Sequence, residues 1–126
     1  MSEQRFALEG NVEHFTIAAI ATENPDFRKV LWTGKHSQIV IMTVPVGGEI
    51  GDEVHETTDQ TLPFISGSGE ADLNGHTHPI DAGDQCAVPA GTQHNFRNTG
   101  DAPLCSTRST VRRSMRWTAP TPPRKR

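Results

Sequence analysis

The segment GDQCAVPAGTQHNFRN, residues 83–98, holds two short extended runs joined by a tight turn. Pro89 and Gly91 form the turn, because proline presets its own φ and glycine tolerates a positive φ. His94 then begins the second run. In a small barrel, a histidine just after such a turn can meet ligands from another strand.

The rest of the middle region has the same rhythm of short extended runs with turn residues at their boundaries. Residues 37–48, SQIVIMTVPVGG, are rich in β-branched side chains and end at a proline and a glycine pair. Asn74-Gly75 predicts a two-residue hairpin that pairs Leu73 with His76, because both central residues of a type I′ turn need positive φ. Only residues 12–21 favour a helical turn. The pattern predicts an all-β fold, either an antiparallel sandwich or a small barrel.

A polar segment, GGEIGDEVHETTDQ at residues 47–60, could form either a solvated turn or half of a metal site. If EVHETT, residues 53–58, is a strand, Glu53 and His55 share one face and Val54 lies opposite. Two ligands on one face of a strand make a natural half-site. His94 would supply the other half.

Both segments resemble the conserved motifs of the cupin family. The pattern G-x5-P-x-G-x2-H-x3-N of the second cupin motif is filled at every fixed position of residues 83–98. The first motif, G-x5-H-x-H-x(3,4)-E-x6-G, is matched in spacing, but a glutamate replaces its first histidine and a glutamine its glutamate. Its positions fall on Gly47, Glu53, His55, Gln60 and Gly67.

The resemblance implies an all-β double-stranded β-helix (a cupin or jelly-roll barrel) with a divalent metal held by Glu53, His55, Gln60 and His94. Two imidazoles and one carboxylate suit Zn, Fe, Mn or Ni, and ligand identity alone does not choose among them. We expect either a metal-dependent enzyme acting on a sugar-like or small organic acid substrate, or a non-catalytic barrel that binds a small molecule. The sequence leaves the choice between an enzyme and a binding protein open.

Other candidate ligands fit the site less well. The carboxylates of Glu49, Asp52 and Glu56 fall between the motif positions, so we expect them on the surface. His76 and His78 form a His-x-His pair, but neither a glutamate nor a glutamine follows at the motif spacing. We expect this pair either near the barrel interior away from the metal or on a dimer surface.

Composition restricts the class of protein. Two cysteines in 126 residues cannot make a disulfide framework, and they suit a reducing compartment. Cys86 shares a strand face with Val88, which predicts a buried and inert thiol. The sequence shows neither a signal peptide nor the run of about 18 apolar residues needed to span a bilayer. We therefore expect a cytoplasmic homodimer that binds a small-molecule ligand or substrate and neither membrane nor nucleic acid.

The end of the chain differs in charge from the rest. Residues 1–107 carry a net formal charge of −10 and residues 108–126 carry +7. We divide the chain into an N-terminal segment (1–26), a cupin barrel domain (27–107) and a basic, disordered tail rich in proline and arginine (108–126). One set of codons for Leu104 to Met115 also encodes, in another frame, LLYTIYGPPEH, which resembles the last strand of small bacterial cupins. We hypothesise a frameshift from about residue 104 onward, which would leave the chain without a normal closing strand.

Overall fold

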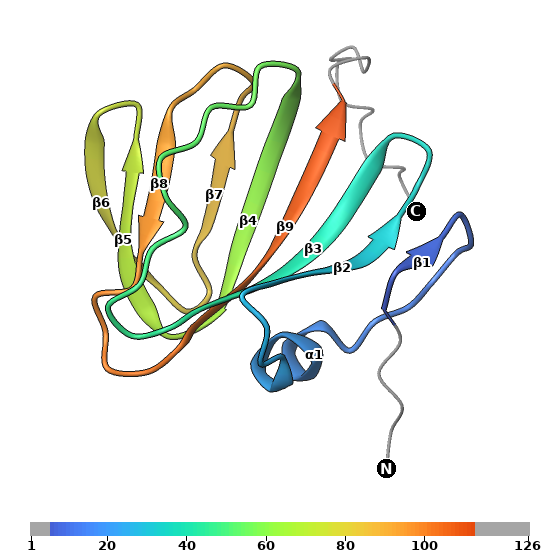
Figure 1. The fold of residues 1–126 in the computed structure, drawn as a ribbon, viewed down its shortest axis with the longest axis horizontal. Helices are drawn as coiled ribbons and strands as arrows, with labels where there is room; N and C mark the ends of the chain where they lie inside the picture. The colour runs from blue at the N-terminus through green and yellow to red at the C-terminus, as the bar shows by residue number, and fades with distance from the viewer. Residues whose placement is uncertain (1–5, 113–126) are drawn as a thin grey trace, which may run out of the picture.

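A computed structural model describes residues 6–112 of the chain. The described part holds one short helix and a series of strands, coloured along the chain in Figure 1. The elements are β1 (Leu8–Glu9), α1 (Ile17–Glu23), β2 (Arg28–Thr33), β3 (Ser37–Val44), β4 (Thr58–Ser66), β5 (Ser68–Leu73), β6 (His76–Asp81), β7 (Gln85–Val88), β8 (His94–Arg97) and β9 (Leu104–Arg112).

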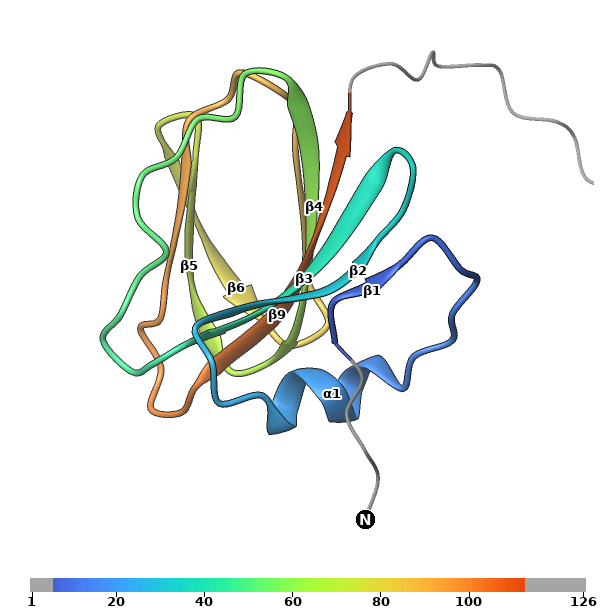
Figure 2. The ribbon, with the colours of Figure 1, turned by 45° about the vertical axis from the view of Figure 1, so that its right-hand side comes forward.

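The strands form two sheets that face each other, as Figure 2 shows. One sheet has the order β1-β2-β3-β9-β4-β7 and the other the order β6-β5-β8. All pairs are antiparallel except the short parallel pair of β1 with β2. The predicted all-β architecture is therefore confirmed. No helix within residues 6–112 is long and apolar enough to cross a membrane.

Alternation along β3 and β9 separates two apolar cores. Val44 and Leu104 point between the sheets, into a core completed by residues of β4 to β8, among them Phe64 and Phe96. The intervening residues of β3 and β9, such as Ile41 and Cys105, point to the opposite face of the large sheet, against which α1 packs through Ala21. The barrel interior and the helix-covered face thus share one sheet.

The predicted hairpin between β5 and β6 is confirmed. Leu73 pairs with His76 and Ala71 with His78, and Asn74 and Gly75 adopt φ values of 51° and 85°. Both histidines are exposed, so they do not lie in the barrel interior. Cys86, by contrast, is buried in the inner core beside Val88, as predicted; burial, together with the nearby Asp84, raises the pKa of its thiol.

Three local expectations differ from the structure. Residues 53–58 do not form one strand: Glu53 makes a single bridge to His94, and β4 begins only at Thr58. The helix is present but begins at Ile17, midway through the predicted range, and ends at Glu23. Strand β2 was not predicted; its apolar residues Val30, Leu31 and Trp32 follow two charged ones.

The expected absence of a closing strand is wrong. Residues 104–112 form β9, which lies in the large sheet between β3 and β4 and pairs with both. Two neighbouring strands satisfy its backbone hydrogen bonds, so the strand forms although much of its inner face is polar. The expected domain boundary at 107/108 therefore falls inside β9. The rest of the predicted tail, residues 113–126, lies outside the described residues.

Candidate metal centre

The backbone brings the two predicted half-sites together. The N–H of Glu53 donates to the carbonyl of His94 (2.9 Å), and the N–H of His94 donates back to the carbonyl of Glu53 (3.0 Å). Two residues further on, the carbonyl of His55 accepts a hydrogen bond from the N–H of Gly91 (2.8 Å). The loop before β4 is therefore fixed to β8 and to the turn that precedes β8.

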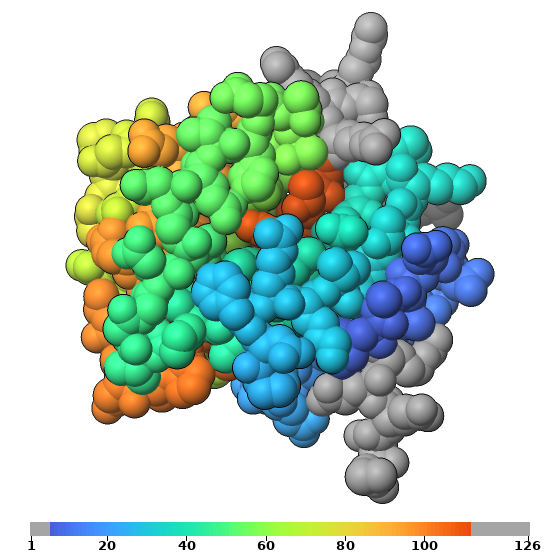
Figure 3. Space-filling model, viewed as in Figure 1, coloured from blue at the N-terminus to red at the C-terminus, as the bar shows by residue number. Residues whose placement is uncertain are grey.

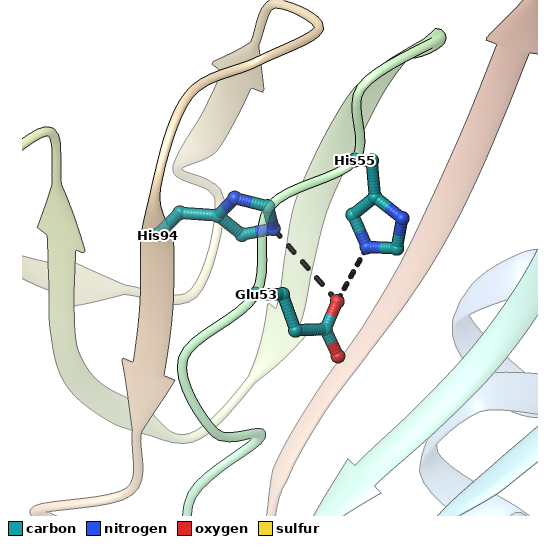
Figure 4. Close-up of side chains that lie close together, drawn as sticks. All are labelled: Glu53, His55 and His94. Atoms are coloured by element: carbon teal, nitrogen blue, oxygen red, sulfur yellow. Dashed lines mark hydrogen bonds and ion pairs between the residues drawn. The ribbon is translucent and has the colours of Figure 1, made fainter.

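Three side chains meet at this point, as Figure 4 shows. The ring Nε2 of His55 lies 2.6 Å from Oε2 of Glu53, and Nε2 of His94 lies 3.9 Å from the same oxygen. One ligand atom from each of these residues falls within 4.8 Å of the others. Glu53 and His55 are in contact although they do not lie on a strand, and Val54 between them is exposed. The geometry gathers three of the four predicted ligands, Glu53, His55 and His94.

His94 is oriented for metal binding. The ring is 2% exposed, and its Nδ1–H donates to the carbonyl of Thr92 at 2.9 Å. That bond leaves the lone pair on Nε2, the arrangement found in most metal-binding histidines. Nε2 is buried and has no hydrogen-bond partner among the described residues. A buried polar atom without a partner is unfavourable unless something absent from the polypeptide satisfies it.

The electrostatic surroundings keep Glu53 ionised. Burial raises the pKa of the Glu53 carboxyl, but the hydrogen bond from His55 and the charge of Arg108 together outweigh burial and hold the pKa below its usual value. Glu53 is 24% exposed, so it is partly hydrated. An ionised carboxylate beside two imidazoles is a suitable anionic ligand for a divalent ion.

Arg108 is the functional candidate that the sequence analysis missed. It sits on β9, on the same inward face as Leu104, and is only 2% exposed. Its Nη1 donates to Oε2 of Glu53 at 3.2 Å, while its Nε has no partner among the described residues. Burial, then repulsion from Arg28, lowers the pKa of this guanidinium. Alternation from Leu104 would have placed Arg108 inside, had residues beyond 107 been taken as a strand.

The fourth predicted ligand, Gln60, lies near the cluster, whereas the three carboxylates expected on the surface do not join it. Gln60 is buried on β4, and its Oε1 has no partner among the described residues. Gln60 lines the same pocket as His55 and Arg108. Its role as a metal ligand stays a prediction. Glu49, Asp52 and Glu56 are exposed, as expected.

Comparison with known proteins agrees with this geometry. A family model described as a cupin domain matches residues 40–106. The chain belongs to the cupin family. The protein BH2720 of Bacillus halodurans has a solved structure that is 30% identical to this cupin, with a TM-score of 0.79 and coverage of 84% of this chain and 85% of the other. The expected double-stranded β-helix is thereby confirmed.

Two further proteins are similar to this cupin in sequence or in structure. The uncharacterized protein YrkC of Bacillus subtilis is 40% identical over 89 residues, or 65% of this chain and 47% of its own. A structure described as a predicted oxalate decarboxylase from Thermotoga maritima is 25% identical, with a TM-score of 0.63 and coverage of 68% of this chain and 80% of the other. The chain spans about half the length of the first curated relatives it matches.

Proposed function

We propose that this cupin binds a divalent first-row metal ion through Glu53, His55 and His94, with Gln60 as a fourth ligand. The observation that supports the proposal most directly is the buried Nε2 of His94, which has no partner among residues 6–112 and faces the Glu53 carboxylate. The donor set fits such an ion, because two imidazoles, one carboxylate and one amide oxygen match the preferences of zinc, iron, manganese and nickel.

The proposed role of the metal is to act on a small molecule in the pocket next to it. A bound divalent ion supplies Lewis-acid chemistry to a carbonyl or hydroxyl oxygen. The chain itself would hold the small molecule beside the ion, in the pocket lined by Gln60 of β4 and Arg108 of β9. A small organic acid or a sugar-like compound is the proposed substrate class, in line with the oxalate decarboxylase description of the Thermotoga maritima relative.

One observation favours a second candidate, a barrel that binds a small molecule without catalysis. Arg108 already gives Glu53 a cationic partner at 3.2 Å, so the carboxylate is satisfied without a metal. Metal-loaded protein incubated with small organic acids and sugars separates the two, since only an enzyme releases product detectable by NMR. Binding that shifts the ligand signals without turnover favours the second candidate.

Metal analysis of the purified protein tests the proposed site. We expect about one divalent ion per chain by elemental mass spectrometry, and loss of most of it in His94→Ala. His78→Ala is the matched control, since it removes an exposed imidazole that is outside the cluster. Metal content that is the same in wild type and His94→Ala would refute the site.

Two broader predictions belong with this proposal. We propose that the protein is a homodimer, which sedimentation velocity tests directly. We also propose a cytoplasmic location for the protein, which fractionation of the source cells tests.

A further inference from the structure

A pocket of about 380 Å³ adjoins the cluster, and most of the residues that line it are of polar types. Among its lining residues are the cluster member His55 and two arginines, Arg28 of β2 and Arg108 of β9. Figure 3 shows atoms of β9, in red, visible between the green segment that leads into β4 and the cyan strand β3. The lining of the pocket comes from β2, β3, residues 54–60 and β9.

The Arg108 guanidinium is short of negative partners. Among the described residues it has one hydrogen bond, to Glu53, although it is 2% exposed and its Nε is also buried. The nearby charge of Arg28 adds repulsion rather than compensation. Buried arginines are normally held by several hydrogen bonds to carboxylates or carbonyls, so this one has unused donors.

A metal at the cluster would increase the excess of positive charge around Arg108. Glu53 is the carboxylate shared by His55, His94 and Arg108. A divalent cation bound to that carboxylate would draw its charge away from Arg108. The pocket is lined by two guanidinium groups, and the exposed Glu56 is the one carboxylate among its described lining residues.

We propose that Arg108, assisted by Arg28, forms an anion-binding subsite that takes a small organic carboxylate beside the metal. The inference rests on the proposed function for the neighbouring metal, but both arginines line the pocket whether or not a metal is bound. A planar guanidinium pairs with a carboxylate through two parallel hydrogen bonds, and Arg108 lines the pocket. The pocket volume is within the range of small-molecule sites.

Calorimetric titration of malonate, a simple dicarboxylate probe, tests the subsite on metal-free and zinc-loaded full-length protein. We expect wild type to bind malonate in both forms, and more tightly with zinc. Arg108→Gln should weaken malonate binding at least tenfold in both forms, and Arg28→Gln should weaken it less. Lys29→Gln is the matched control, because it removes a half-exposed positive charge on the strand that carries Arg28.

Several results would overturn the inference. Malonate affinity of Arg108→Gln within twofold of wild type would do so, as would absence of wild-type binding at millimolar malonate. Inorganic phosphate binding as tightly as malonate, with the same dependence on Arg108, would show a general anion site and refute carboxylate selectivity. Circular dichroism establishes folding, and Arg108→Lys, which keeps the charge but loses the planar fork, replaces Arg108→Gln if the latter does not fold; it too should weaken malonate binding.

The two proposals fail separately. If the proposed metal site is wrong, zinc content will be equal in wild type and His94→Ala, while malonate binding to metal-free protein will still depend on Arg108. If the proposed anion subsite is wrong, zinc binding will depend on His94, but malonate binding will be the same in wild type and Arg108→Gln.

Discussion

Arg108 has an interior position that the fold alone does not require. Its neighbours on the same face of β9 are Leu104, in the apolar core, and Ser106. A guanidinium at such a position loses hydration, and the hydrogen bond to the partly exposed Glu53 replaces only part of it. A residue that lowers stability at a pocket wall is typical of a site selected for binding.

The first prediction concerns this loss of stability. Arg108→Met should raise the free energy of unfolding of the metal-free protein by about 1–2 kcal/mol, because an apolar side chain replaces a buried charge with one hydrogen bond. Glu53 is not left unpaired, since it is 24% exposed and keeps its contact with His55. Urea denaturation measures the change. Lys29→Met, at a half-exposed position outside the pocket, serves as control and should shift the value by less than about 0.5 kcal/mol. A clear loss of stability in Arg108→Met would mean that the ion pair with Glu53 stabilises the fold.

A second residue, Asn98, holds the chain between β8 and β9. Its Nδ2 donates to the carbonyls of Val44 (2.9 Å) and Ala102 (2.8 Å), and its Oδ1 accepts from the N–H of Gly100 (3.0 Å). Asn98→Ala should lower the free energy of unfolding by about 2–3 kcal/mol, because buried backbone groups lose their partners. The exposed Asn11→Ala is the control for urea denaturation. Equal stability of the two variants would contradict this role.

At the residue scale, the sequence predicts the cluster because motif spacing encodes it. Glu53, His55 and His94 were identified from alternation and from the Pro89-Gly91 turn, and the structure brings them together. Arg108 was missed because the polar, basic sequence after Pro103 conceals a strand. Arg108 lies inside because β9 pairs with β3 and β4. These strands are far from β9 in the sequence, so local patterns do not reveal the pairing.

At the element scale, an arginine joins two strands of the small sheet. Arg97 of β8 donates to the carboxylate of Asp72 on β5 and, more weakly, to Glu70 at 3.4 Å. Hydrogen bonds from Arg97 and from Thr77 hold the pKa of Asp72 below its usual 3.8. The folded pKa is thus below the unfolded one, so this stabilisation is present above the unfolded value and is lost as pH falls through the folded one.

The third prediction follows from that sign. Asp72→Asn should lower the melting temperature at neutral pH, and the difference from wild type should shrink as the pH falls below about 3.8. Thermal denaturation followed by circular dichroism at several pH values gives the comparison. Glu70→Gln, which removes the longer and more exposed contact, should have the smaller effect. A difference that is constant down to the lowest pH would refute the ionic origin.

Local signals explain which elements could be predicted. The β5–β6 hairpin was placed to the residue, because Asn74-Gly75 specifies a turn with positive φ and hence a register. Residues 53–58 alternate like a strand, yet only Glu53 forms a bridge, since glycines such as Gly51 (φ 102°) bend the chain. The position of this loop depends on its hydrogen bonds to β8, which the local sequence does not reveal.

At the scale of the whole molecule, β9 joins the two halves of the large sheet. It follows all the other strands in sequence but lies between β3 and β4. The strand can therefore complete the sheet only after all the other described strands have been synthesised. The frameshift hypothesis for residues from about 104 stays a prediction that the nucleotide sequence of the gene tests, and the structure shows that the encoded residues nevertheless form the strand.

The fourth prediction compares two truncations of the chain. Ending the chain after Arg112 keeps every pair of β9 with β3 and β4, whereas ending it after Thr107 removes half the strand. The second truncation exposes facing edges of β3 and β4 and deletes backbone hydrogen bonds with net values of about 0.5–1.5 kcal/mol each. Their sum approaches the total stability of a typical domain, about 5–15 kcal/mol.

We therefore expect the chain that ends at Arg112 to unfold cooperatively in urea, and the chain that ends at Thr107 to lack a cooperative transition and to aggregate. The comparison holds the N-terminal part of the molecule constant, so the difference reports on residues 108–112 alone. Equal transitions in the two truncated chains would show that these residues form a dispensable tail, as the charge pattern first indicated, and would remove the structural basis for placing Arg108 inside the barrel.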